Sequence, residues 1–194
     1  MQIILASGSP RRRQLLSQAG ISHKVIVSNA DETVTGNPKE QVEELALRKA
    51  NAVLSLVTEP GNAIIIAADT LVAIGDDVLG KPADHKEAFA MLKKLQGNTH
   101  IVYTGVALLR LGGEPIVFSD RAEVTFRNLA DEEILAYIAT GEPFDKAGAY
   151  GIQERGSVLV ERVNGDFYTV MGLPISMVCA RLMEMGYNYW ESQV

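Results

Sequence analysis

The chain has 194 residues, 47% of them hydrophobic, which is enough to bury one substantial core without division into independent domains. Its formal net charge is −6, and its pI is about 5.1. This acidity argues against general binding to nucleic acids or acidic membranes. A polyanionic ligand must therefore be small and bound by a local group of basic residues.

Cysteine content and the N-terminus bear on where the protein works. Cys179 is the only cysteine, so no disulfide can form within the chain and a reducing, cytoplasmic location is expected. Its apolar helical neighbours predict a buried side chain and not a nucleophile. Met1 leads directly into an apolar segment, so no targeting leader is expected. The longest apolar run, 63–68, is too short to cross a bilayer.

The first part of the chain alternates short strands with helices. Hydrophobic periodicity and turn residues predict the following elements. In chain order they are strand 2–6, helix 10–19, strand 24–27, helix 38–56 and strand 63–68. The last of these is a continuous apolar run, typical of a strand covered on both faces, and we expect it to end at Asp69 and Thr70. Open α/β sheets commonly present functional residues at such strand ends.

The rest of the chain is richer in hairpins. We expect a hairpin of 71–74 with 78–79, a helix from 84, long strands 100–111 and 115–126, a helix at 129–140, a hairpin of 158–163 with 167–171, and a helix from 174. Asn164-Gly165 is a strong turn signal for the last hairpin. The pattern predicts a single α/β domain over 1–194, with a twisted mixed sheet flanked by helices around a central cleft.

The turn after the first strand has the composition of an anion site. Ser9 is suited to cap the following helix and Pro10 to occupy its first turn. The backbone amides around Gly8 and Ser9 would then face a phosphate, with Arg11 and Arg12 beside them. The alternative is an ordinary strand–turn–helix connection with solvated arginines.

Lys49 lies in the apolar stripe of the helix predicted over 38–56. Burial of an unpaired ammonium group is costly, so Lys49 must reach a carboxylate, a phosphate or solvent. The alternative is a lysine whose stem covers apolar surface while its charge stays in water.

The polar residues that stand out form two groups. Arg11, Arg12, Lys49 and Lys81 are candidate anion ligands, whereas Glu32 and Asp69 are candidate metal ligands or bases, with Asp31 and Asp145 in reserve. Hydrolysis of a phosphoanhydride needs this combination: cations neutralise the polyphosphate, and carboxylates bind a divalent ion and activate water. Oxygen ligands favour Mg²⁺ or Mn²⁺. The sequence has no P-loop and no nucleophile elbow.

Several motifs, in order along nearly the whole chain, resemble the Maf-like nucleoside triphosphate pyrophosphatases. They are Ser7-Gly8-Ser9-Pro10-Arg11-Arg12, Asp31-Glu32-Thr33, Arg48-Lys49-Ala50, Ala68-Asp69-Thr70, Gly80-Lys81-Pro82, Asp145-Lys146-Ala147-Gly148-Ala149-Tyr150-Gly151-Ile152-Gln153 and Val170-Met171-Gly172-Leu173-Pro174. Each motif is weak alone, but the ordered set is specific. The resemblance implies a Maf/ITPase-like fold.

The resemblance also implies an activity: hydrolysis of a nucleoside triphosphate between its α and β phosphates. Asp69 matches the family's proton acceptor, and Glu32, Lys49 and Lys81 match other active-site positions. Arg12 matches the arginine that contacts phosphate. Arg11, Thr70 and Gln153 are similar to the set in the subgroup that acts on dTTP and UTP. Arg13 matches a variable position and is assigned no role.

Two other functions stay open on the sequence. The family has been linked to arrest of septum formation, so a regulatory binding protein is one alternative, although the acidic charge disfavours nucleic acid. The same chemistry with another base, 7-methyl-GTP or ITP, is the second. The resemblance also suggests a homodimer. Tyr187, Tyr189 and Trp190, if exposed, could contribute to its contact, or they could pack on their own domain.

Overall fold

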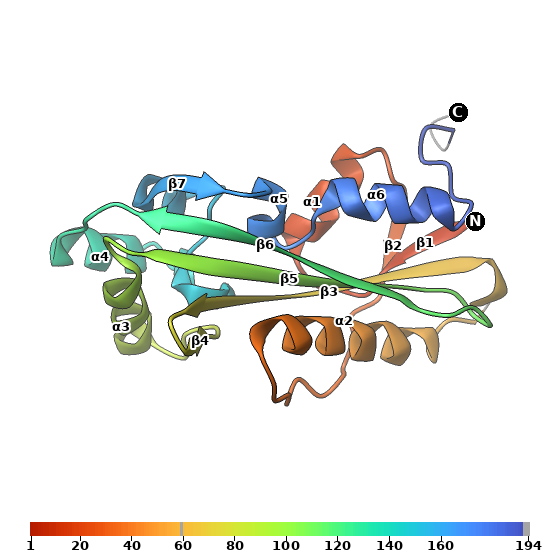
Figure 1. The fold of residues 1–194 in the computed structure, drawn as a ribbon, viewed down its shortest axis with the longest axis horizontal. Helices are drawn as coiled ribbons and strands as arrows, with labels where there is room; N and C mark the ends of the chain where they lie inside the picture. Colours follow the sequence, from red (N-terminus) through yellow and green to blue (C-terminus); the bar gives the residue numbers. More distant parts are fainter. Residues whose placement is uncertain (59, 192–194) are drawn as a thin grey trace. The chain divides into compact units, whose positions relative to one another are not determined.

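A computed structural model describes residues 1–58 and 60–191 of the chain (Figure 1). Its strands are β1 (Gln2–Leu5), β2 (His23–Val25), β3 (Ala63–Ile74), β4 (Asp77–Leu79), β5 (Thr99–Leu109), β6 (Ile116–Phe126) and β7 (Val160–Asn164). Its α-helices are α1 (Pro10–Gln18), α2 (Pro38–Leu54), α3 (His85–Leu95), α4 (Asp131–Ile138), α5 (Phe167–Met171) and α6 (Ile175–Glu184). Short 3₁₀ helices occupy Pro60–Asn62, Glu142–Asp145, Ala147–Ala149 and Arg155–Leu159.

The strands form a mixed sheet in the order β2-β1-β3-β5-β6-β7, with β4 paired to β3. The predicted α/β class is therefore confirmed. By backbone contacts the chain divides into two compact units. The first contains residues 1–69, 104–120 and 172–194, and the second contains residues 70–103 and 121–171.

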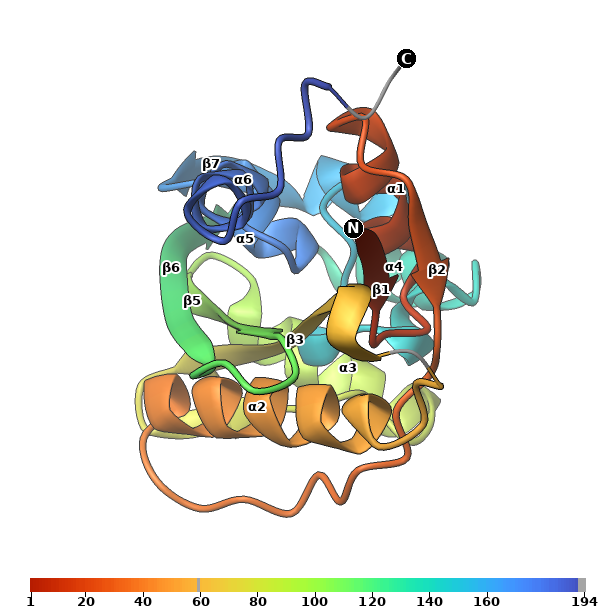
Figure 2. The same ribbon diagram turned by 90° about the vertical axis from the view of Figure 1, so that its right-hand side faces the viewer.

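In the first unit, β1 pairs in parallel with β2 on one side and with β3 on the other. Helix α2 lies on one face of these strands, and α1 and α6 lie on the opposite face (Figure 2). Helix α2 begins sharply because Asn37 and Glu40 form a reciprocal capping box. The capping box therefore sets the start of α2 at Pro38.

Side chains of β1 and β3 alternate between two apolar layers, as the period of a strand requires. Ile4 and Ile65 pack in one cluster with Ala46, Ala50 and Val53 of α2. Ile3, Leu5, Ile64 and Ile66 project from the opposite face and are also buried. Burial of each such isoleucine contributes roughly 1.5–3 kcal/mol.

Gly105 allows α2 to approach the sheet unusually closely. A Cβ atom at Gly105 would overlap the backbone carbonyl group of Val42, near the start of α2. Only glycine leaves room for this backbone approach. The contact sets the depth of α2, which carries Lys49 two turns further on.

In the second unit, the C-terminal part of β3 forms an antiparallel hairpin with β4, as the sequence predicts. β6 pairs antiparallel with β7. His100, Phe126 and Tyr150 form an aromatic cluster with edge-on ring contacts, and the His100 Nε2 and Tyr150 Oη atoms lie 2.8 Å apart. These rings pack in the interior of this unit.

Two sequence expectations about local structure are wrong. Residues 167–171 form helix α5 and not a return strand, because Asp166 caps a helical turn by accepting the Tyr168 amide at 2.9 Å. The strand expected at 63–68 continues to Ile74, because Val72 to Ile74 pair with β4 and extend it.

The remaining expectations about burial have mixed outcomes. Cys179 is buried in α6, as predicted, and burial raises the pKa of its thiol. Of the two alternatives for Tyr187, the structure shows packing on its own domain: the chain turns at Gly186, and the Tyr187 side chain is buried. Trp190 is 75% exposed. No helix among residues 1–58 and 60–191 is long and apolar enough to cross a membrane.

Candidate active site

The turn between β1 and α1 is ordered by its own serines. The buried Ser7 Oγ accepts a hydrogen bond from the Ser9 amide at 3.2 Å and from Arg12 Nη1 at 3.1 Å. Ser9 caps α1 as predicted, with its hydroxyl oxygen accepting from the Arg12 amide. The Ser9 amide is thus engaged by Ser7, whereas Gly8, expected beside it in the anion cradle, is exposed.

The Arg12 side chain is anchored at a point far away in the sequence. Its Nε donates to the carbonyl oxygen of Gly172 at 2.7 Å, in the last of the sequence motifs. Burial lowers the pKa of the Arg12 guanidinium, an effect that the charges of Asp69 and Glu32 oppose and that of Arg11 reinforces. Arginine stays protonated in proteins, so Arg12 presents a fixed positive charge close to two carboxylates.

Lys49 projects from α2 to two carboxylates. Its Nζ lies 2.6 Å from Asp69 Oδ1 and 2.7 Å from Glu32 Oε1. The Lys49 and Asp69 side chains are 14% and 13% exposed, whereas that of Glu32 is 64% exposed. Of the alternatives for Lys49, the structure shows a carboxylate-paired lysine, which resolves its position in an apolar stripe.

Asp69 lies within β3 and not at its end, contrary to expectation. Along one edge of β3, pairing with β1 extends to Ile66, and pairing with β4 begins at Val72. Asp69 falls between these paired stretches. A strand can therefore present a carboxylate where its pairing partner changes as well as at its end.

Arg48 holds the loop that carries Glu32, a role that the sequence did not reveal. Its Nη1 donates to the Thr33 carbonyl oxygen at 2.6 Å, and its Nη2 pairs with Glu44 one turn earlier in α2. The Thr33 amide donates in turn to Asp31 Oδ1 at 2.9 Å, which lowers the pKa of the Asp31 carboxyl. Asp31 therefore shapes the loop. The sequence signal that could have indicated this role was that Arg48 stands next to Lys49 in one motif.

Three predicted residues belong to the second unit. Lys81 is exposed and follows β4, and Thr70 is half-buried in β3 next to Asp69. Gln153 is half-buried between two 3₁₀ helices. The motifs of Lys81 and Gln153 are adjacent in this unit, because the Gly148 amide donates to the Gly80 carbonyl oxygen at 3.0 Å. Asp145, held in reserve as a ligand, pairs with Lys146 at 2.6 Å.

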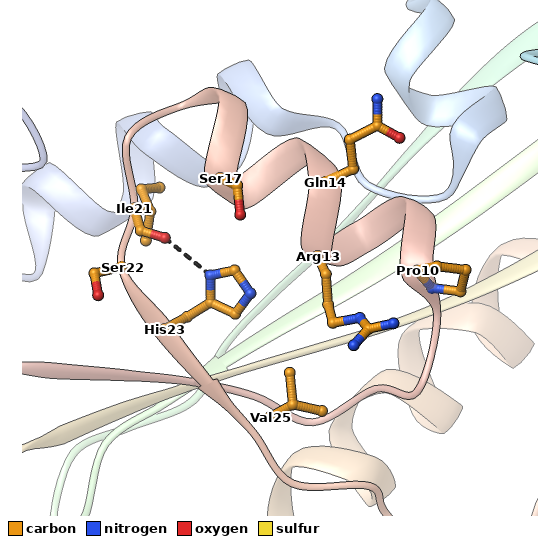
Figure 3. Close-up of a pocket in the computed structure, with 8 residues that line it drawn as sticks. All are labelled: Pro10, Arg13, Gln14, Ser17, Ile21, Ser22, His23 and Val25. Atoms are coloured by element: carbon orange, nitrogen blue, oxygen red, sulfur yellow. Dashed lines mark hydrogen bonds between the residues drawn. The ribbon is translucent and has the colours of Figure 1, made fainter.

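A surface pocket of about 580 Å³ lies between α1 and β2 (Figure 3). Arg13 and His23 project toward it, and the His23 ring is oriented by a 2.9 Å contact between Nδ1 and the Ile21 carbonyl oxygen. None of the predicted site residues lines this pocket. Arg13, which was assigned no role, lines this pocket, and the residues that contact Lys49 do not.

The carboxylates near Lys49 are a sparse set of metal donors. Within the described part of the chain, no group of three or more His, Cys, Asp or Glu side chains is arranged to hold a metal ion. Glu32 and Asp69 both contact Lys49 Nζ and so lie near one another. Taken together, Arg12, Lys49, Glu32 and Asp69 form a charged cluster in the first unit that can bind an anion and accept a proton.

These features agree with the family to which the chain belongs. Residues 2–185 match the model of the Maf-like protein family, so the chain is a member of that family. The resemblance inferred from the motifs is thereby confirmed.

Individual relatives make the comparison more specific. A protein of Bacillus cereus named dTTP/UTP pyrophosphatase is 48% identical over 189 residues, covering 96% of this chain and 97% of the relative. One of Bacillus anthracis with the same name is 47% identical over the same shares. A solved structure of a HAM1 protein from Coxiella burnetii has a TM-score of 0.52 at 13% identity, covering 95% of this chain and 99% of that one. The last similarity concerns the fold alone.

Proposed function

We propose that the chain is a nucleoside triphosphate pyrophosphatase that hydrolyses dTTP and UTP to the monophosphate and pyrophosphate, acting as one domain over residues 1–194. The observation that carries this proposal is Lys49, held by Asp69 and Glu32 beside the buried Arg12. The names of the 47–48% identical relatives support the same activity and the same substrates.

The cations bind the polyphosphate in this proposal. Arg12 is oriented by Ser7 Oγ and the Gly172 carbonyl oxygen, so its guanidinium is preorganised for phosphate. Lys49 contributes a second positive charge in the same unit. We assign Lys81 to the same task, because an exposed lysine beside the 145–153 motif is available to an anion. The Ser7–Ser9 turn holds Arg12 in place and offers Gly8 to the phosphates.

Asp69 acts as the proton acceptor. Because Lys49 Nζ donates to Oδ1, we assign proton transfer to the other carboxylate oxygen, Oδ2. Oδ2 takes the proton from a water molecule as its oxygen attacks phosphorus. The α–β phosphoanhydride bond breaks, and its electron pair leaves with the displaced phosphate oxygen. Glu32 completes the ion pair with Lys49 and keeps the ammonium group between the two carboxylates.

Glu32 and Asp69 also fit a divalent cation, Mg²⁺ or Mn²⁺. Both offer hard oxygen donors, and Mg²⁺ is commonly held by one or two carboxylates with waters and substrate phosphates completing its shell. Two protein carboxylates are therefore a sufficient donor set. The bound cation would neutralise charge on the phosphate oxygens. Measuring pyrophosphate release with added Mg²⁺ or Mn²⁺, and again after a chelator has removed the metal, tests this assignment directly.

We assign selection of the base to Arg11, Thr70 and Gln153, following the family resemblance. Gln153 offers one amide donor and one acceptor, which can pair with the edge of a pyrimidine. The proposal also includes a cytoplasmic location and a homodimer with no nucleic-acid or membrane partner. Light scattering of the purified chain measures its oligomeric state.

One assay tests the proposed function. Pyrophosphate release is measured with dTTP, UTP, 7-methyl-GTP and ITP, for the wild type and for Asp69→Asn. We expect dTTP and UTP to be hydrolysed fastest and Asp69→Asn to lose at least about a hundredfold in kcat. Asp131→Asn is the control, because Asp131 forms a surface pair with Lys93 at 2.8 Å. Wild-type rates in Asp69→Asn would refute the mechanism.

A further inference from the structure

Residues 151–156, here called the Gln153 loop, form a closed turn in the second unit. A Cβ atom at Gly156 would overlap the carbonyl oxygen of Gly151, so the two ends of the loop lie against each other. Gly151 and Gly156 are both buried, whereas Gln153 between them is half-buried. The loop therefore presents Gln153 from a narrow base.

Two side chains outside the loop bind this base. The Gly151 amide donates to Tyr137 Oη at 3.1 Å. The Arg155 and Gly156 amides donate to Glu142 Oε2 and Oε1 at 3.0 and 3.1 Å. The Tyr137 hydroxyl itself donates to Glu142 Oε1 at 3.0 Å, which joins the two anchors. Tyr137 and Glu142, which are hydrogen-bonded to each other, thus bind three backbone amides of this six-residue loop.

The chemistry of this pair explains why both groups are needed. Tyr137 is only 6% exposed, and burial raises the pKa of its phenol, so the hydroxyl stays protonated and keeps its donor. The Glu142 carboxylate accepts three hydrogen bonds, which an amide with a single acceptor oxygen cannot do. The buried Lys146 fixes the Glu142 backbone by donating to its carbonyl oxygen at 2.7 Å.

We propose that Tyr137 and Glu142 are positioning residues for selection of the nucleobase, acting through Gln153. This inference rests on the proposed function and on the assignment of Gln153 to the base. A glutamine amide distinguishes thymine from cytosine only if its donor and acceptor are held in one orientation, because O4 of thymine accepts where N4 of cytosine donates. The pair that anchors the loop fixes that orientation, and neither residue needs to touch the nucleotide.

Steady-state kinetics of Tyr137→Phe and Glu142→Gln with dTTP and dCTP test this proposal. Each variant keeps the size of the side chain and removes loop-anchoring hydrogen bonds. We expect the KM for dTTP to rise roughly tenfold and the preference for dTTP over dCTP to fall by a similar factor, with kcat within about twofold of wild type. Unchanged KM and unchanged preference in both variants would overturn the proposal.

Tyr150→Phe is the matched control, because it removes another buried hydroxyl of the same unit, bonded to His100 and not to the loop. It should lower Tm while leaving the preference for dTTP over dCTP unchanged. An equal loss of preference in Tyr150→Phe would mean that general destabilisation, and not positioning, explains the effect.

A double-mutant cycle with Gln153→Ala separates action through Gln153 from independent action. If Tyr137 acts through Gln153, the preference of Tyr137→Phe/Gln153→Ala should equal that of Gln153→Ala alone. Additive losses would refute the proposal. Failure of the wild type to hydrolyse dTTP would instead refute the proposed function, so the two failures are distinguishable.

Discussion

Lys49 Nζ lies 2.6 Å from Asp69 Oδ1, and both side chains are largely shielded from solvent. The second partner of Lys49, Glu32, is 64% exposed at a similar distance. The distances are similar but the exposure is not, so the two ion pairs should differ in strength, because water and salt screen the exposed one.

Double-mutant cycles in urea unfolding should separate the two pairs. With Lys49→Met, Asp69→Asn and Glu32→Gln, we expect a coupling energy of about 1–2 kcal/mol for Lys49 with Asp69 and at most about 0.5 kcal/mol for Lys49 with Glu32. The smaller coupling should decline further in about 0.5 M salt. Two equal couplings would contradict the shielding of Asp69.

Arg48 should matter for activity more than for stability. Replacement by lysine removes the fork that holds the Thr33 carbonyl oxygen and Glu44, so the loop that carries Glu32 loses its support. We expect Arg48→Lys to lower kcat/KM roughly tenfold with a Tm change below about 2 °C. Arg181→Lys, which alters a surface pair with Glu184, is the control and should leave kcat/KM unchanged. Wild-type kcat/KM in Arg48→Lys would exclude the support role.

The parts of the site that the sequence predicted are those with a local signature. Lys49 was conspicuous because a charge interrupted an apolar helical stripe, and Ser9 because serine before proline is a helix cap. The anchor of Arg12 on Gly172 was invisible, since a backbone carbonyl leaves no signature and lies 160 residues away. The wrong expectation at 167–171 has a different origin: Phe167, Tyr168 and Val170 have high strand propensity, which outweighed the local signal of the helix cap at Asp166.

His100 should make stability depend on pH. Burial lowers the pKa of His100 from 6.5 to about 4, so between these values the unfolded chain binds more protons than the folded one. The free energy of unfolding therefore falls as pH decreases from about 6.5 toward 4, by up to about 3 kcal/mol from this residue. Urea unfolding at pH 7, 6, 5 and 4.5 measures the dependence. His100→Gln, which cannot titrate, should flatten it in this window, and an unchanged slope would refute the assignment.

Gly105 should be intolerant of even a methyl group. A Cβ atom there would overlap the Val42 carbonyl group, and a backbone cannot move aside as a flexible side chain can. We expect Gly105→Ala to reduce the free energy of unfolding by about 1–3 kcal/mol, as overpacked cores do. The displacement of α2 should also move Lys49 away from Asp69 and lower kcat by more than the unfolded fraction explains. Gly61→Ala is the control, because no atom of the described residues lies within 4 Å of a Cβ at that exposed position. Loss of stability without loss of kcat in Gly105→Ala would show that the depth of α2 does not set the geometry of Lys49.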